Sequence, residues 1–190
     1  MNVLTVVAHP RTTSLTFAAA ERFAQGLADA GHETEVLDLH RVGFDPVLRE
    51  ADEPDWSNPN KTYSPETEAE IERMKRHDAL AYIFPMWWYD VPAILKGYID
   101  RVWNHGFAYG GRAKLPHRKV LWLALCAATP EQLAKRGYDR MFEHHLNVGL
   151  AEYVGIADSR VAYLYDTLSE DPRHAQRLLA QAYELGLRFN

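Results

Sequence analysis

The sequence predicts an α/β fold with a doubly wound, five-stranded parallel sheet, because three of its patterns agree. Short apolar runs alternate with longer segments in which apolar residues recur every three or four positions, the periods of buried strands and of amphipathic helices. Five strands separated by helices favour parallel pairing with helices on both faces of the sheet. The strand order 2-1-3-4-5 is the natural arrangement, and it places a topological switch point between strands 1 and 3.

Length, charge and cysteine content limit the class of protein. The chain has 190 residues, the size of a single domain (1–190) with room for a core. Its net charge of −5 and its scattered basic residues exclude the clustered basic face of a nucleic-acid-binding protein. A single cysteine, Cys126, excludes an internal disulfide framework and fits a reducing compartment. Because residues 2–8 lack a basic leader region and no run is long enough to span a membrane, we expect a cytoplasmic protein.

A polar loop separates the first strand from the first helix. Val3–Ala8 is a nearly continuous apolar run, typical of a central strand, and a helical face begins at Leu15 and ends near Gly31. The loop between them carries hydroxyl and cationic side chains, namely His9, Arg11, Thr12, Thr13, Ser14 and Thr16. Free N–H groups and the dipole at a helix N-terminus favour an anion, so the loop is a candidate phosphate site. Neither a Walker motif nor a Gly-x-Gly-x-x-Gly fingerprint is present, and the alternative is that Ser14 or Thr13 only caps the helix.

The next segments are a second strand, a long irregular connection and a second helix. Residues 33–39 alternate between polar and apolar side chains and end in an apolar stretch, which predicts a strand. Residues 40–63 are rich in proline and acidic residues, and a structureless connection of this length is usually functional or interface-forming. We expect the acidic side chains of residues 50–55 to form a solvated surface, and we predict no metal site. Ser64 then caps a helix that runs to about Arg76.

The third strand is followed by a loop of large side chains. Ala79–Phe84 is a short apolar run that predicts a strand buried on both faces. Asp90 is expected to cap a third helix, whose apolar face runs from Val91 to Trp103. Residues 85–89 carry three aromatic side chains at the carboxyl end of a strand, where open α/β sheets bind ligands. These side chains either stack on a flat, conjugated ligand or pack in the core or a subunit interface.

The remaining chain supplies two more strands and two more helices. Residues 104–111 contain too much glycine for regular structure and carry further aromatic residues. Lys119–Cys126 and Arg160–Tyr165 are apolar runs that predict the fourth and fifth strands. A helix from about Tyr138 lies between them, and the last helix begins at Pro172.

Both unusual loops fall at the switch point of this topology. The polar loop follows strand 1 and the aromatic loop follows strand 3, so they flank one crevice. A ligand with a phosphate at one end and a planar ring at the other would span them. Flavin mononucleotide, or the flavin half of FAD, has this form.

Four segments of the chain are similar, in the same order, to those of one protein family. They are Ala8–Ala18, Phe84–Tyr89, Val91–Val102 and Gly106–Gly110. The chain thereby resembles the flavodoxin-like NAD(P)H:quinone oxidoreductases, which include quinone reductases of the DT-diaphorase type and the ancillary oxidoreductases of bacterial potassium-efflux systems. The resemblance implies a flavodoxin-like fold, a non-covalent FAD or FMN, and NAD(P)H as co-substrate. It also implies a homodimer with active sites at the subunit interface and hydride transfer, by way of flavin N5, to quinones or similar electrophiles.

The resemblance assigns site residues position by position. The family's phosphate-side loop corresponds to His9, Thr13, Ser14, Leu15 and Thr16. The loop under the isoalloxazine ring corresponds to Pro85, Met86, Trp87, Trp88 and Tyr89. Trp88 is expected to form part of the wall of the substrate pocket. Tyr109 corresponds to an aromatic residue that, in the family, closes this pocket from the partner subunit.

The chain departs from the family after the fourth strand. Where the family has Thr-Thr-Gly-Gly at the flavin pyrimidine edge, residues 125–130 read Leu-Cys-Ala-Ala-Thr-Pro. Because alanine is bulkier and less flexible than glycine, Ala127 and Ala128 are expected to change flavin affinity or geometry on that side. Tyr138 and His144 have the spacing of a Tyr and a His that are proposed to relay charge in the quinone reductases. The altered loop leaves a second function open, that of a flavin-binding regulatory subunit with a peripheral membrane-protein partner and incidental reductase activity.

Overall fold

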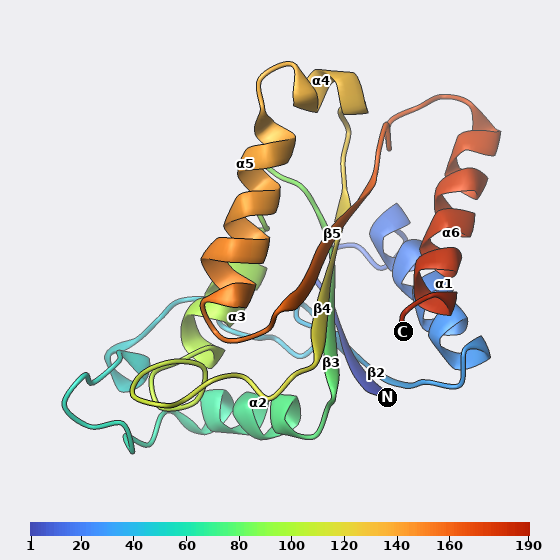
Figure 1. Ribbon diagram of the computed structural model, residues 1–190. Helices are drawn as coiled ribbons and strands as arrows, with labels where there is room; N and C mark the ends of the chain where they lie inside the picture. Colours follow the sequence, from blue (N-terminus) through green and yellow to red (C-terminus); the bar gives the residue numbers. More distant parts are fainter.

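The computed structural model describes residues 1–190, and its centre is a five-stranded parallel sheet between two layers of helices (Figure 1). The strands are β1 (Asn2–Val7), β2 (Glu33–Asp38), β3 (Ala79–Pro85), β4 (Lys119–Leu125) and β5 (Asp158–Leu164). Their order, β2-β1-β3-β4-β5, and the parallel pairing of all neighbours confirm the predicted flavodoxin-like topology. The central strands are mostly apolar because helices cover both of their faces.

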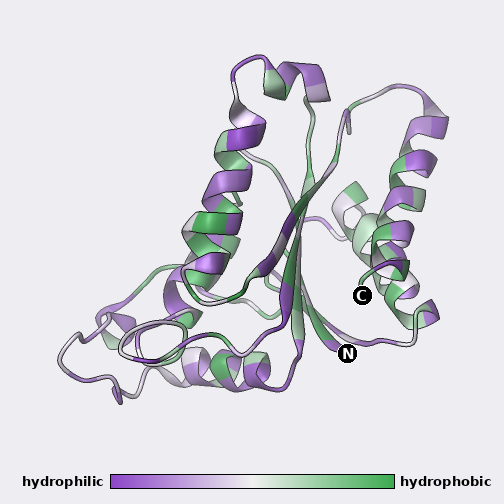
Figure 2. Cartoon of the chain, viewed as in Figure 1, coloured by the Kyte–Doolittle hydropathy of each residue, from purple (hydrophilic) through white to green (hydrophobic).

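Each face of the sheet has its own set of helices. One face carries α1 (Leu15–Asp29) and α6 (Pro172–Leu187), and the other carries α2 (Pro65–Lys75), α3 (Ala93–Val102), α5 (Tyr138–His144) and η2 (His145–Glu152), a π-helical continuation of α5. The short elements η1 (Glu50–Asp52) and α4 (Pro130–Ala134) lie in loops. Figure 2 shows hydrophobic residues on the strands and on the helix sides that face them. None of the helices combines the length and the apolar composition needed to span a bilayer.

The helices α1 and α6 touch through two glycines. A β-carbon at Gly186 would lie 2.1 Å from the carbonyl oxygen of Phe23, and one at Gly26 would lie 2.2 Å from that of Tyr183. Only a residue without a side chain allows two backbones to approach this closely. This contact holds α6 against α1 and leaves the outer edge of β5 uncovered.

The start of α3 differs from the prediction that Asp90 caps it. The helix begins at Ala93 with Pro92 in the capping position, and no side chain caps it. Asp90 pairs through its backbone with Trp87, and its carboxylate accepts a hydrogen bond from the Val91 N–H at 2.7 Å. The prediction was wrong because a tight turn, rather than the helix, sets the conformation of Asp90.

The sequence led us to expect that the acidic segment after β2 is solvated, but part of it is buried. Asp52 is completely buried, and its carboxylate forms an ion pair with Arg101 of α3 at 2.8 Å. The same carboxylate accepts hydrogen bonds from the N–H and the hydroxyl group of Ser64, at 2.8 and 2.9 Å. A buried charge of this kind is tolerated only when it is fully compensated. The pair therefore fixes this segment against α3.

Candidate functional site

The loop after β1 folds back on itself and contacts the loop after β3. The Nδ1 atom of His9 lies 3.0 Å from the Arg11 backbone nitrogen and 3.1 Å from the Arg11 carbonyl oxygen, so the ring is held against the backbone of its own loop. Burial lowers the pKa of His9 below its ordinary value, which favours the neutral form of the ring. The His9 ring lies 6.0 Å from that of Trp87, measured between centroids. The two loops that were predicted to flank one crevice are therefore neighbours.

The start of α1 is capped and still has free donors. Ser14 is buried, and its Oγ accepts a hydrogen bond from the Phe17 N–H at 3.3 Å, so the predicted cap is present. The backbone N–H groups of Thr13, Leu15 and Thr16 have no acceptor within the protein. Free N–H groups at the positive end of a helix dipole favour an anion. The cap and an anion site are therefore compatible.

Residues 87–90, which we call the aromatic turn, form a two-residue hairpin after β3. Trp87 and Asp90 exchange two backbone hydrogen bonds, of 3.2 and 3.1 Å. Between them, Trp88 (φ 55°) and Tyr89 (φ 60°) both have left-handed backbone conformations. Turns of this type favour asparagine and glycine, and the left-handed conformation costs other residues roughly 1–2 kcal/mol each. The aromatic turn is a strained structure.

The tip of the aromatic turn is also exposed. Trp88 has 95% of its surface accessible to solvent. An indole in water contributes little packing to offset the backbone strain, and such strained positions cluster at functional sites. Of the two interpretations of the aromatic loop, burial in the core is therefore excluded for Trp88. A ligand or a subunit interface remains.

An apolar pocket of about 260 Å³ lies between the aromatic turn and the loop after β4. We call it the apolar slot, and its lining residues are Met86, Trp88, Tyr89, Cys126, Ala127 and Ala128. Neither alanine has a positive φ, so this backbone does not require glycine, and the two methyl groups line the slot instead. The Ala127 N–H has no acceptor within the protein and is available to a ligand.

Of the two residues suggested for charge relay, the structure brings one to the aromatic turn. The Tyr138 ring stacks on that of Tyr89, with 3.8 Å between centroids and 23° between planes. His144 is exposed at the end of α5, and no hydrogen bond or ring contact connects it to the aromatic turn. Six residues of helix separate it from Tyr138, which corresponds to about 9 Å of helix axis.

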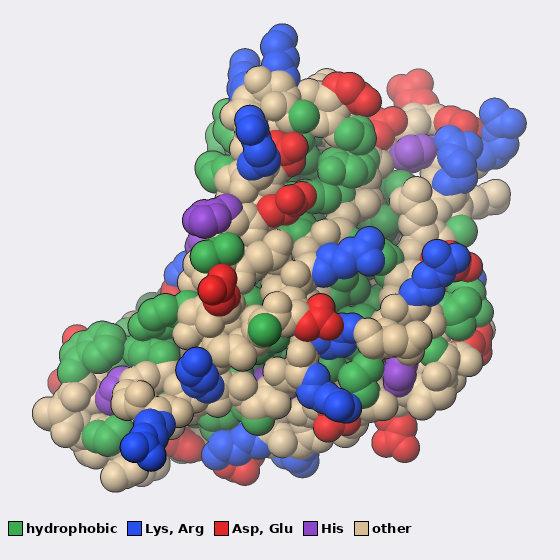
Figure 3. All heavy atoms as spheres, viewed as in Figure 1, with side chains coloured by type: hydrophobic (Ala, Val, Ile, Leu, Met, Phe, Trp, Pro, Cys, Tyr) green, Lys and Arg blue, Asp and Glu red, His purple; other side chains and the backbone are tan.

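Tyr109 belongs to a separate aromatic cluster at the other end of α3. Its ring lies 5.7 Å from those of Trp56 and His105 and 6.0 Å from that of Tyr153, between centroids. Trp56 and Tyr153 are largely exposed, and Figure 3 shows hydrophobic side chains gathered at lower left over these loops. Sequence reasoning missed both residues. The only signal for Trp56 was a large aromatic residue within a long acidic connection.

Comparison with known proteins agrees with this geometry. A family model described as a flavodoxin-like fold (Flavodoxin_2) matches residues 1–185, so the chain belongs to this family. The chain is 42% identical over 185 residues, 95% of its length, to the Escherichia coli K12 protein named uncharacterized NAD(P)H oxidoreductase YcaK, and the match covers 94% of that relative.

Solved structures give the same result. The NAD(P)H:quinone oxidoreductase from Methanothermobacter marburgensis matches with a TM-score of 0.91 and 30% identity, over all of this chain and 96% of the other. An FMN-dependent NADH-azoreductase from Bacillus anthracis, in complex with FMN, shares the fold with a TM-score of 0.72 and 18% identity, over 100% of this chain and 99% of that one. These likenesses confirm the resemblance to the NAD(P)H:quinone oxidoreductases and the expectation of an enzyme of that type.

Proposed function

We propose that this chain is a flavin-dependent oxidoreductase that transfers two electrons, as hydride, from NAD(P)H to quinones or similar electrophiles. The observation that supports this most strongly is the strained and exposed aromatic turn, which lies beside the apolar slot and next to the free N–H groups of the β1 loop. An anion site beside an aromatic, apolar slot matches the phosphate and the planar ring of a flavin. The quinone oxidoreductase and the FMN-dependent azoreductase that share this fold support the same function.

The residues of the crevice fit a flavin at both of its ends. The free N–H groups at the start of α1 would hold the phosphate, together with the side chains of His9, Thr13, Ser14 and Thr16. The ring would lie against Pro85 and Met86 and against the aromatic turn, with the Ala127 N–H at its edge. The methyl groups of Ala127 and Ala128 narrow the slot on that side.

The chain's own residues would orient the reactants and stabilise charge. When bound, a flavin supplies a ring that accepts hydride and returns it to the acceptor. Trp88 and Tyr89 offer aromatic faces that align a nicotinamide or quinone ring and exclude water from it. The free Ala127 N–H would be available to stabilise negative charge on a bound ring. Tyr138 supports the turn by stacking on Tyr89, and no side chain needs to move a proton.

We further propose a homodimer in which Tyr109 closes the pocket of the partner subunit. This is supported by the distance between the aromatic cluster around Tyr109 and the aromatic turn, which lie at opposite ends of α3. The exposed Trp56 and Tyr153 extend the cluster into a surface that a second subunit would cover.

A second candidate function, a flavin-binding regulatory subunit of a membrane system, is favoured by the replacement of the glycine-rich loop by Ala127 and Ala128. Such a protein would bind the flavin and turn over slowly. Turnover distinguishes the two candidates.

Absorbance spectroscopy of the purified protein tests the proposal. After reconstitution with FMN or FAD, anaerobic NADPH or NADH should bleach the absorbance of the bound flavin. Addition of menadione should then reoxidise the flavin rapidly and restore this absorbance. Trp88→Ala should raise the KM for menadione or lower kcat, whereas Val47→Ala, at an exposed apolar residue outside the crevice, should change neither. If neither flavin binds, the proposed function is wrong. If flavin binds and is reduced but menadione reoxidises it slowly, the regulatory function is correct instead.

A further inference from the structure

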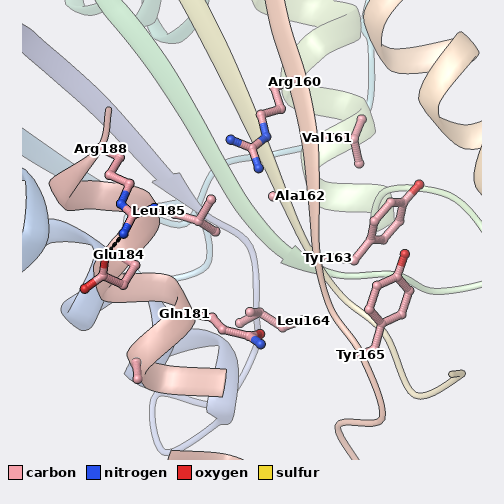
Figure 4. Close-up of a pocket in the computed structure, with 11 residues that line it drawn as sticks. Arg160, Val161, Ala162, Tyr163, Leu164, Tyr165, Gln181, Glu184, Leu185 and Arg188 are labelled. Carbon is pink, nitrogen blue, oxygen red and sulfur yellow. Dashed lines mark ion pairs between the residues drawn. The ribbon is translucent and has the colours of Figure 1, made fainter. Parts of the chain in front are cut away.

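The free edge of β5 borders a pocket that the proposed function does not use. The pocket has a volume of about 660 Å³ and lies between β5 and α6 (Figure 4). Arg160 and Leu164 line it from the strand, and Gln181 and Leu185 line it from the helix. Tyr163 and Tyr165 also line the pocket, and in Figure 4 their rings lie on the other side of the strand from Arg160. None of the residues that form the apolar slot lines this pocket.

The backbone of β5 presents unpaired donors and acceptors along this edge. β5 is the last strand of the sheet, so one of its sides has no neighbour. The Leu164 carbonyl accepts a hydrogen bond from the Cys126 N–H at 2.8 Å, which shows that Leu164 faces β4. Because backbone groups alternate along a strand, those of Val161 and Tyr163 face outward. No hydrogen bond outside the sheet uses them, and such a row is a template for an added strand.

On the α6 side of this edge, one positive charge has no partner, while Glu143 and Asp139 lie near Tyr163 on the opposite face. Arg160 is exposed and has no ion pair or hydrogen bond in the protein, and Figure 4 shows its guanidinium group on the α6 side of the strand. The neighbouring carboxylate of Glu184 already forms an ion pair with Arg188, at 3.1 Å. A chain with a net charge of −5 therefore keeps one uncompensated cation at an open strand edge. A carboxylate is the group that pairs best with it.

We propose that the edge of β5 binds an extended, acidic peptide segment of another protein, which adds a sixth strand and places a carboxylate against Arg160. One way of pairing with the β5 strand of a second copy is unfavourable. Antiparallel pairing centred on Val161 would place the two Arg160 side chains diagonally opposite on the same face of the sheet, where like charges repel. The acidic segment gains the same backbone hydrogen bonds without this repulsion.

Peptide binding to the full-length protein tests the proposal. The probe is a short fluorescein-labelled peptide in which valine and threonine alternate around a central glutamate, and its counterpart has lysine at that position. Fluorescence anisotropy should show that the glutamate peptide binds at least about tenfold more tightly than the lysine peptide, as expected for one charge-assisted contact. Arg160→Glu should reverse this preference. Arg112→Glu, at another exposed arginine without an ion pair, should not.

A second variant separates edge pairing from simple charge attraction. Val161→Pro removes a backbone N–H that faces outward, so the pairing with β4 is kept, and proline is tolerated on an edge strand. This variant should abolish binding of the glutamate peptide while its circular dichroism spectrum and its NAD(P)H oxidation stay unchanged. The proposal is overturned if neither peptide binds at about 1 mM, or if Val161→Pro leaves binding intact. It is also overturned if this variant converts a dimer to a monomer in size-exclusion chromatography, since a second copy would then be the occupant.

Discussion

The strain in the aromatic turn can be measured by comparing glycine with alanine at Trp88. At an ordinary position, glycine is less stable than alanine by roughly 0.5–1 kcal/mol, because it loses more conformational freedom on folding. At a left-handed position the order reverses, because alanine keeps the β-carbon clash that costs roughly 1–2 kcal/mol. Trp88 has φ 55° and is 95% exposed, so both substitutions remove the same few contacts. We expect Trp88→Gly to be more stable than Trp88→Ala by about 1 kcal/mol.

Urea denaturation followed by far-ultraviolet circular dichroism measures this difference without relying on tryptophan fluorescence. For a chain of this size, about 1 kcal/mol corresponds to a shift of roughly 2–4 °C in Tm, so thermal melts give a second reading. Both variants should lose the same fraction of their menadione reductase activity, since both lack the indole. If alanine proves as stable as glycine, the turn is not strained, and the argument from strain to function fails.

Three further predictions concern stability. His117 is buried, and burial lowers its pKa from 6.5 to about 4, so the unfolded chain takes up a proton at this residue before the folded chain does as the pH falls. The free energy of unfolding should therefore drop by about 2 kcal/mol between about pH 7.5 and pH 5. Urea denaturation of His117→Gln over the same pH range should show a smaller drop. Gly186→Ala pushes a β-carbon into the backbone of α1 and should lower Tm by an amount equivalent to about 1–3 kcal/mol, whereas Gly149→Ala should not, because its nearest neighbour, His145 Nδ1, would lie at an ordinary contact distance of 3.5 Å. Asp52→Ala removes one of the two carboxylates that pair with the buried Arg101, the other being that of Glu66, and should destabilise the protein by about 1–3 kcal/mol in urea denaturation; a loss below about 0.5 kcal/mol would contradict the role of the buried pair.

The fold could be predicted because its determinants are local and repeated. The central strands are mostly apolar, the edge strand β2 alternates, and each long helix has one apolar face, so their succession specifies the sheet, its parallel pairing and its switch point. The meeting of the β1 and β3 loops then follows from the strand order alone. The contact between His9 and Trp87 confirms it.

The errors occurred where a tertiary contact or a tight turn overrides the local sequence pattern. Asp52 lies in an acidic run that has every feature of a solvated surface, and its burial depends on Ser64 and on Arg101, which lies 49 positions later. Asp90 is a residue type that often caps helices, but its backbone forms hydrogen bonds with Trp87 in the hairpin instead. The stack of Tyr138 on Tyr89 joins the start of α5 to the aromatic turn, and no periodicity in the sequence predicts this contact.

The geometry of α3 leads to a final prediction about subunits. The aromatic turn precedes this helix and Tyr109 follows it, and its 10 residues separate them by about 15 Å of rigid axis. At the far end, Asn104 is anchored to the Asp52 carbonyl at 2.7 Å, so the loop that carries Tyr109 cannot swing back to its own turn.

A pocket that uses both Trp88 and Tyr109 must therefore combine two protomers. In a hybrid dimer of Trp88→Ala and Tyr109→Ala protomers, one pocket lacks both side chains and the other is intact. Random re-association of equal amounts gives hybrids in about half of the dimers, each with one intact pocket, so mixing two impaired proteins should restore roughly one quarter of the wild-type menadione reductase activity. Unmixed samples treated in the same way are the control. If the mixture shows only the mean of its two components, each pocket is built from a single chain, and Tyr109 has no part in closing the pocket of its partner.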